Sequence, residues 1–404
     1  MSNLSFMEKL LDGVEVEWKA LGDDDFVEVA NSGRKPVKAS LRVAGTTPYY
    51  GANNIQDYVD GYTHDGEYTL IAEDGSASLE NYSIQYVSGK FWANNHVHVI
   101  RGKSGMNTRY LYHYLCIVNF MTFLTGGGRA KLTKGKMVEI QIPIPCPENP
   151  KKSLEIQAEI VRILDTFTEL TTELSTELTA RKKQYNYYRD QLLSFKEGEV
   201  DHLPMGHEDI GEFIRGGGLQ KKDFTETGVG CIHYGQIYTH YGTYTDKTKT
   251  NVSKEFFKKA RKAKSGDLVI ATTSENDEDL CKAVAWLGSE DIAVSSDACF
   301  YRHKLNPKYV SYFFQTEQFH KQKRQYITGA KVRRVNADNL AKILIPIPSP
   351  EEQARIVAIL DKFDTLTNSI SEGLPREIAL RQQQYEYYRD LLLSFPKPDS
   401  EVAA

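Results

Sequence analysis

The side chains best suited to chemistry in this 404-residue chain are spaced in ways that argue against an active site. His96 and His98 alternate on a predicted strand without a third ligand, so we interpret them as structural histidines. Asp12, Glu17 and Lys19 match a nuclease pattern only generically and with too short a spacing. The five cysteines form no C-x-x-C pair, which is typical of reduced thiols in a reducing compartment. We therefore predict no catalytic residue and no metal site.

Cofactor and membrane signals are also missing from the sequence. There is no G-x-x-x-x-G-K-[ST] phosphate loop and no Asn/Asp-Pro-Pro-aromatic motif of an amino-methyltransferase. The glycine runs 126–128 and 216–218 are typical of turns. No apolar run approaches the roughly 20 residues of a membrane span, and residues 1–10 do not resemble a signal peptide. We expect a cytoplasmic protein that binds no membrane and no cofactor of its own.

Basic side chains gather in three segments, although the net charge is −4. Residues 125–138 and 319–334 contain four and six Lys/Arg and no acid, and residues 247–264 contain eight with one Glu. Two of these segments hold a Thr-Gly pair 17 residues before an Ile-Pro-Ile-Pro sequence, and this matched position favours DNA contacts over an ordinary solvated face. The predicted DNA contacts are Thr125, Arg129 and Lys131 in the first half, and Lys321, Lys323, Arg324, Thr328, Lys331, Arg333 and Arg334 in the second.

The elements that must position these residues occur twice, about 200 residues apart. The second copy repeats Ile-Pro-Ile-Pro, 8 of 11 residues of a Gln-Ala-x-Ile-Val-x-Ile-Leu-Asp segment, and 11 of 15 residues ending in Leu-Leu-Ser-Phe. The paired segments are 142–145 with 345–348, 157–167 with 353–363, and 181–195 with 381–395. Residues 23–105 and 207–300 show no mutual similarity. Each half is therefore a variable region followed by a near-constant segment.

The near-constant segments are predicted to be long helices, because apolar residues recur at three- and four-residue steps. Ser153 is a plausible N-cap of the first, and Ser349-Pro-Glu-Glu352 predicts a capping box with proline at the first helical position. Residues 157–195 would form a rod of about 58 Å at 1.5 Å per residue. Three Thr-Glu-Leu tetrads lie within residues 168–179 of this rod. At Gly373-Leu-Pro375 we expect the second rod to kink or break.

The variable regions are predicted to be mixed, which gives an α+β fold. Predicted strands cover residues 15–18, 67–72, 97–101, 267–272, 283–287 and 298–302, and predicted helices cover 108–124 and 308–325. The expected division is a globular domain at 1–150, a helix at 151–197, a second globular domain at 198–348, a second helix at 349–397 and a tail at 398–404. The internal repeat predicts a pseudo-two-fold arrangement of two domains separated by two antiparallel helices.

The order of these segments, with the duplicated Ile-Pro-Ile-Pro, Gln-Ala-x-Ile-Val-x-Ile-Leu-Asp and Tyr-x-Tyr-Tyr-Arg-Asp-x-Leu-Leu-Ser-Phe sequences, resembles the specificity subunits of type I restriction-modification systems. The resemblance covers essentially the whole chain. The variable regions match that family only in position. The tetrads are similar to short repeats that the family carries in its central helix.

The resemblance implies that each variable region is a target recognition domain for one half of a split site in double-stranded DNA. It implies that the helices set the spacing and that two modification subunits dock on this frame to methylate adenine N6. Restriction subunits would join them, and S-adenosylmethionine, ATP and Mg²⁺ would be bound by those partners. Two alternatives stay open on the residues alone: an enzyme with unrecognised motifs, and a scaffold that binds only proteins.

Overall fold

The computed structural model describes residue 11 and residues 14–126 and 130–396, and it divides into two compact units. The first unit contains Met1–Glu173 and Ala379–Ala404, and the second contains Leu174–Ile378. The long helices are not separate bodies, because each unit takes a part of both helical segments. The predicted tail lies outside the described residues.

The first unit contains two four-stranded sheets and a two-stranded ladder. One sheet is antiparallel, with the order β2 (Val27–Val29), β9 (Val97–Gly102), β6 (Tyr68–Ala72), β7 (Ile84–Val87). The other has the order β4 (Ile55–Val59), β3 (Ala44–Tyr50), β8 (Lys90–Ala93), β5 (His64–Asp65), with β3 and β8 parallel. The ladder pairs β1 (Val16–Ala20) with β10 (Gln141–Pro145). The shorter helices are η1 (Asn31–Gly33), η2 (Ala39–Leu41), α2 (Thr108–Leu115), η3 (Phe120–Phe123) and α3 (Lys134–Met137).

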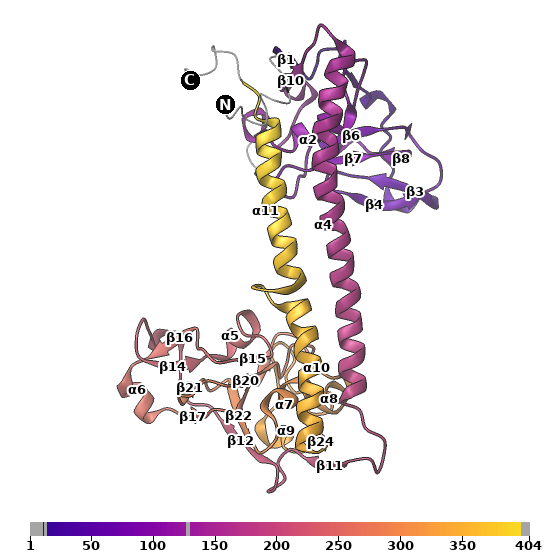
Figure 1. The fold of residues 1–404 in the computed structure, drawn as a ribbon. Helices are drawn as coiled ribbons and strands as arrows, with labels where there is room; N and C mark the ends of the chain where they lie inside the picture. Colours follow the sequence, from indigo (N-terminus) through magenta and orange to yellow (C-terminus); the bar gives the residue numbers. More distant parts are fainter. Residues whose placement is uncertain (1–10, 12–13, 127–129, 397–404) are drawn as a thin grey trace. The chain divides into compact units, whose positions relative to one another are not determined.

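The second unit repeats this plan with additional strands (Figure 1). Its first sheet has the order β12 (Gly211–Arg215), β22 (Ala298–His303), β18 (Leu268–Ala271), β20 (Ala283–Trp286), β15 (Tyr244–Thr245). Its second has the order β13 (Phe224–Thr225), β16 (Thr250–Val252), β14 (Val229–Ile232), β21 (Ile292–Val294), β17 (Lys262–Ala263). Two ladders pair β11 (Asp201–Pro204) with β24 (Leu344–Ile347), and β19 (Thr273–Ser274) with β23 (Arg333–Arg334). The shorter helices are η4 (Lys221–Asp223), α5 (Tyr234–Thr239), α6 (Lys254–Lys259), α7 (Pro307–Phe313), α8 (Glu317–Arg324) and α9 (Ala337–Leu340).

Several predicted strands are found, but both predicted helices of the variable regions were too long. The chain leaves α2 at Cys116, and the next helical turn is η3. It leaves α7 at Phe314, and Thr316 then caps α8 by accepting from the Phe319 amide. A new N-cap side chain satisfies free amides of the second segment, so two short helices form where the apolar pattern predicts one.

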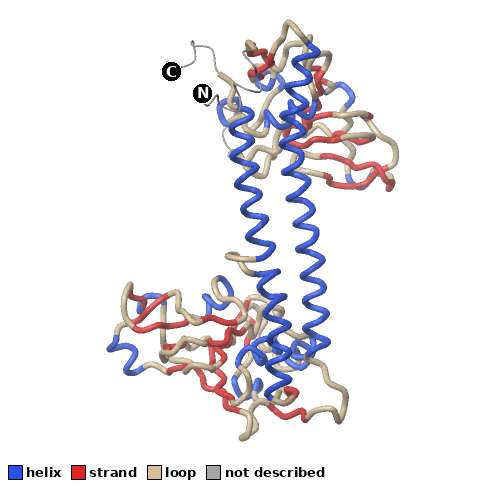
Figure 2. Tube along the Cα trace, in the orientation of Figure 1, coloured by secondary structure: helices blue, strands red, loops and turns tan. Residues whose placement is uncertain are grey.

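The first long helix, α4 (Pro150–Leu192), is uninterrupted over 43 residues (Figure 2). Ser153 does not cap it, contrary to the prediction. The helix begins three residues earlier, and Asn149 Oδ1 accepts from the Lys152 amide. Ser153 is buried inside the first turns, where its hydroxyl accepts from the Gln157 side chain at 2.9 Å.

The second long segment forms two helices, α10 (Pro350–Asn368) and α11 (Gly373–Leu393), rather than one. Ser349 caps α10 by accepting from the Glu352 amide, and Pro350 occupies its first turn, as predicted. The predicted capping box is only half formed among the described residues, because the Glu352 carboxylate accepts from Arg355. The break predicted at Gly373-Leu-Pro375 occurs just before it, over residues 369–372. Gly373 has φ +78°, a left-handed conformation that glycine adopts without strain.

Matched contacts attach the helices to the sheets of their own unit. Asn107 and Asn306 donate their amides to the buried side-chain carbonyls of Gln157 and Gln353, each at 2.8 Å. The hydroxyls of Tyr110 and Tyr309 donate to the carbonyls of the first proline of each Ile-Pro-Ile-Pro, Pro143 at 2.9 Å and Pro346 at 3.0 Å. Asp165 and Asp361 take the same place in a third contact. Asp165 accepts from Arg109 and contacts His113, and Asp361 accepts from Lys308 and Tyr312.

Within each unit a helix of one repeat packs on a helix of the other, and Figure 1 shows that the two run in opposite directions there. In the first unit Phe167 stacks on Tyr388 with ring centroids 5.3 Å apart, and Leu392, Leu393 and Phe395 are buried in its core. In the second unit Tyr188 stacks on Phe363 at 5.6 Å, and Leu193 is buried. Matched residues thus exchange partners, because Phe363 takes the place of Phe167 and Tyr188 that of Tyr388, as the internal repeat predicts.

Candidate nucleic-acid interface

The loop between Thr328 and Arg334 is closed by its own backbone. The two residues exchange amide-to-carbonyl hydrogen bonds of 2.9 Å, and the Thr328 hydroxyl donates to the Arg334 carbonyl at 3.2 Å. Gly329 has φ +87°, and a Cβ there would clash with the Val332 carbonyl. The two residues of the Thr-Gly pair therefore have distinct structural roles, because the threonine closes the loop and the glycine turns it.

The first unit contains the same closure at the matched position. Thr125 and Lys131 exchange two 2.9 Å hydrogen bonds, and the Thr125 hydroxyl donates to the Lys131 carbonyl at 3.1 Å. Gly126 has φ +90°. The predicted contact Arg129 lies outside the described residues. Both Thr-Gly pairs thus begin loops that end at a basic residue six positions after the threonine.

The same backbone hydrogen bonds fix both loops on their sheets. Leu132 donates its amide to the Glu73 carbonyl, and Val335 donates to that of Thr272. The next layer also matches, because the Glu73 amide donates to His96 and the Thr272 amide donates to Asp297. These bonds make Glu73 equivalent to Thr272 and His96 equivalent to Asp297. The side chains beside the two loops can therefore be compared position by position.

In the first unit this place is filled by a network of opposite charges. Glu73 pairs with Arg34 at 2.6 Å and with Lys131 at 2.9 Å. Burial opposes ionisation of Glu73, but the hydrogen bonds from Arg34 and Lys131 outweigh it and lower its pKa. Asp74 contacts His96 at 2.6 Å. His98 is buried between Asn31 and the Leu132 carbonyl, which confirms its interpretation as a satisfied strand histidine.

In the second unit the loop is more openly basic. Arg333 pairs with Asp277 at 2.9 Å and also donates to the Gly329 carbonyl at 2.7 Å. Lys331 and Arg334 are exposed, and neither forms an ion pair with another residue that the structure describes. Exposed guanidinium and ammonium groups on a fixed loop are the groups that proteins use on DNA.

The prediction for helix α8 needs one correction. Lys321 and Arg324 are exposed, and Arg324 approaches Glu317 at 3.4 Å. Lys323 is only 1% exposed, and its ammonium donates to the carbonyls of Asp277, Glu278 and Leu280, the last at 2.6 Å. Burial lowers the pKa of Lys323. Its ammonium holds residues 277–280 in place and is not on the surface, so we remove Lys323 from the candidate DNA contacts.

The site contains residues that sequence reasoning missed. Thr273, Asp297 and Arg215 lie beside the loop of the second unit, and Arg34 and Glu73 lie beside that of the first. Each comes from a variable region, where the two halves share no sequence. Only the register of neighbouring strands brings these residues to the loops. That register cannot be derived from the sequence unless the order of the strands in the sheet is already known.

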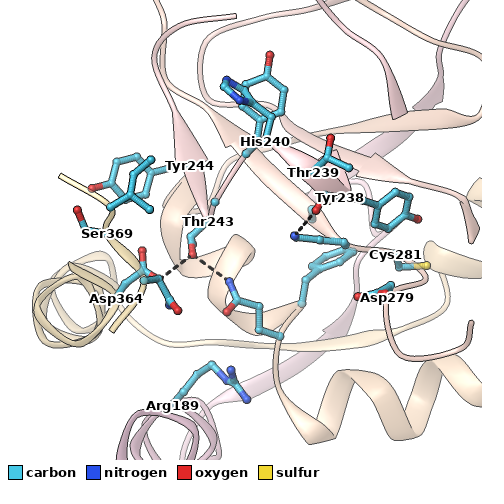
Figure 3. A pocket seen from close by; sticks show the side chains of 18 of the residues that line it. Arg189, Tyr238, Thr239, His240, Thr243, Tyr244, Asp279, Cys281, Asp364 and Ser369 are labelled. Carbon is cyan, nitrogen blue, oxygen red and sulfur yellow. Dashed lines mark hydrogen bonds between the residues drawn. The ribbon is translucent and has the colours of Figure 1, made fainter. Parts of the chain in front are cut away.

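A larger cavity of about 800 Å³ lies elsewhere in the second unit, among α4, α10 and residues 238–244 (Figure 3). Thr243 donates to Asp364 at 3.4 Å and accepts from Gln315 at 3.2 Å, and Lys282 donates to the Tyr238 carbonyl. Burial raises the pKa of Asp364. The lining mixes Arg189, His240 and Lys282 with Asp279 and Asp364, so it selects no single ligand charge.

Two further observations concern the described part of the chain. It contains no group of three or more His, Cys, Asp or Glu side chains that could hold a metal ion. None of its helices combines the length and the apolar character that a membrane crossing requires.

Comparison with known proteins defines the class to which this fold and these paired loops belong. The family model described as "Type I restriction modification DNA specificity domain" matches residues 15–181 and 205–380. A type I restriction enzyme specificity subunit of Haemophilus influenzae is 45% identical over 98% of this chain and 99% of its own length. The EcoR124I/EcoR124II specificity subunit of Escherichia coli is 35% identical over 99% of both chains.

The chain therefore belongs to the type I restriction-modification specificity subunits, which are non-catalytic components of their systems. A solved S subunit from M. genitalium shares its α+β fold, with a TM-score of 0.58 and 12% identity over 96% of this chain and 98% of the other. A chain from a structure of type I complex assembly covers 94% of this one with a TM-score of 0.57 and 14% identity.

Proposed function

We propose that each unit of this chain reads one half of a bipartite site in double-stranded DNA. The observation that carries the proposal is the pair of loops 125–131 and 328–334, which have the same closure, the same glycine turn and the same attachment to the sheet. Two units with the same topology and the same loop suit a ligand that has two similar parts, as a bipartite DNA site does.

The proposal assigns the near-constant helices to the gap between the half-sites. Two modification subunits dock on them, extrude one adenine in each half-site and methylate its N6. Restriction subunits complete the complex that cleaves unmodified DNA. S-adenosylmethionine, ATP and Mg²⁺ are bound by these partners and not by this chain. Chemistry on a base requires its removal from the stack, and a separate frame can fix the register while the partners perform it.

The proposal is supported by the two kinds of contact that proteins make with DNA. Phosphate contacts position a protein on DNA, and base contacts specify the sequence. Thr125 and Lys131 in one unit, and Thr328, Lys331, Arg333 and Arg334 in the other, combine hydroxyl and basic groups suited to both kinds of contact. Lys321 and Arg324 add exposed charge on α8.

The test is to express the full chain with the modification subunit of its own system and to sequence the methylome. We expect adenine methylation at one bipartite site, and no S-adenosylmethionine binding by the purified chain alone in calorimetry. Methylation by the chain alone would show that it is itself an enzyme. Affinity for DNA that does not fall steeply with salt would favour a protein-only scaffold.

A further inference from the structure

A cavity of about 290 Å³ opens beside the loop 328–334 of the second unit. Four segments meet there: the end of β12, the residues after β18, the turn between β21 and β22, and the loop itself. The polar side chains of its wall include Arg215, Thr273, Asp297, Thr328, Arg334 and Asn336. None of the comparisons and none of the sequence motifs assigns a role to this cavity.

The charged groups of the cavity are available. The Arg215 side chain makes one long hydrogen bond, from Nε to the Ser296 carbonyl at 3.4 Å. Among the residues that the structure describes, neither Arg215, Arg334 nor Asp297 forms an ion pair. The matched place in the first unit differs, because Glu73 there neutralises Arg34 and Lys131, and His96, equivalent to Asp297, contacts Asp74.

The mixture of charges identifies the chemistry of the ligand. A DNA phosphate offers only acceptors and would be repelled by the Asp297 carboxylate. The major-groove edge of a G·C pair offers two acceptors on guanine, O6 and N7, and one donor on cytosine, the N4 amino group. Arginine suits the first two groups and aspartate suits the third.

We propose that this cavity reads a G·C base pair in the half-site of the second unit. Arg215 donates to guanine O6 and N7, and Asp297 accepts from the cytosine amino group. Arg334 and Thr328 hold the wall on the loop side. The inference rests on the proposed function, and it adds Arg215 and Asp297 as specificity-determining residues outside the predicted basic segments.

The experiment uses the full chain with its modification subunit, and it compares the methylomes of Arg215→Ala, Asp297→Asn and the control Lys222→Ala. Lys222 is exposed in η4 of the same unit and does not line the cavity. We expect both cavity variants to relax one G·C position of one half-site, with discrimination lowered about 10- to 100-fold. The control keeps the full site. The other half-site should stay unchanged in every variant, and a thermal unfolding transition equal to that of the unaltered chain reports that the second unit is folded.

Two outcomes would overturn the inference and leave the proposed function standing. If Arg215→Ala slows methylation equally at all sequences and lowers the salt dependence by about one ion, the arginine contacts a phosphate. If both variants keep the wild-type methylome while Lys331→Ala, an exposed loop residue that does not line the cavity, loses it, the loop contacts DNA and the cavity does not. Failure of the proposed function itself would be different, since even the unaltered chain would then direct no site-specific methylation.

Discussion

The two units form the same sheet topology from variable sequences that share no similarity. The order β2-β9-β6-β7 corresponds to β12-β22-β18-β20. The order β4-β3-β8-β5 corresponds to β16-β14-β21-β17, and the central pairs of these two sheets, β3 with β8 and β14 with β21, are both parallel. At the matched loops, however, the first unit places an ion-pair network where the second places an open cavity. The backbone plan is therefore held constant while the side chains beside the loop are free to vary.

This difference indicates which side chains can change the DNA specificity with little loss of folding stability. The side chains beside the loops differ between two units whose sheets match, so we expect new ones there to change the DNA sequence that is read and to leave the sheet intact. The polar contacts that attach the helices are different, because Gln157 and Gln353 are buried and satisfy backbone amides in both units. A change there leaves a partly buried backbone amide without a partner.

The largest test of this comparison replaces residues 207–340 with the equivalent region of another family member. We expect one half-site to change completely and the other half-site and the gap to stay as they are. Methylome sequencing with the same modification subunit measures all three together. A change in both half-sites would mean that the units do not read DNA independently.

A second test removes one tetrad, Thr172–Ser175, from the continuous helix α4. The deletion shortens a helix by about 6 Å at 1.5 Å per residue, which is just under two base-pair rises of about 3.4 Å. We expect the gap between the half-sites to contract by about one or two base pairs with both half-sites unchanged. An unaltered gap in the methylome would show that α4 does not set the spacing.

A third test separates buried from exposed lysine on α8. Lys323→Met removes the donor from three carbonyls, of which that of Leu280 is buried, and we expect it to lower the free energy of unfolding by about 3 kcal/mol. Lys321→Met, the matched control on the exposed side, should leave thermal unfolding unchanged. Equal melting temperatures for both variants would contradict the structural role given to Lys323.

The smallest test asks whether the shared frame is energetically equivalent in the two units. Tyr110→Phe and Tyr309→Phe each remove one buried hydroxyl from a proline carbonyl, and we expect each to cost about 1 kcal/mol. Denaturant unfolding of the two variants provides the comparison. If the two losses in the free energy of unfolding differ by more than about 1 kcal/mol, the matched hydrogen bonds have the same geometry but do not stabilise the two units equally.

The sequence was sufficient where it repeats. The helices and the matched Thr-Gly loops follow from local patterns that the second copy reinforces, whereas the Ser349 cap and the break near Gly373 follow from local patterns of the second copy alone. It was insufficient where tertiary contacts decide. Asn149 rather than Ser153 accepts from the first turn of α4. Ser153 lies within the helix, where its hydroxyl accepts from the buried Gln157 side chain. Lys323 lies in a basic segment, but carbonyls from residues 277–280 bury its ammonium.

The variable regions were least accessible to prediction, because short strands obtain their register from partners far along the chain. Arg215 and Asp297 belong to different strand ends, and only the sheet order brings them to one cavity. Thr316 likewise divides one predicted helix into two by capping the second. No repeat marks Arg215 and Asp297, since the two halves share no sequence there.

The burial of Leu392, Leu393 and Phe395 in the first unit has a consequence for synthesis on the ribosome. The second unit is complete in the chain by residue 378, but the first still lacks part of its core. More than 200 residues separate Glu173 from that missing part, and at about 5–20 residues per second their translation takes roughly 10–40 s. The unit that emerges first is therefore the last to close, and it holds an open apolar surface until translation of the final helix ends.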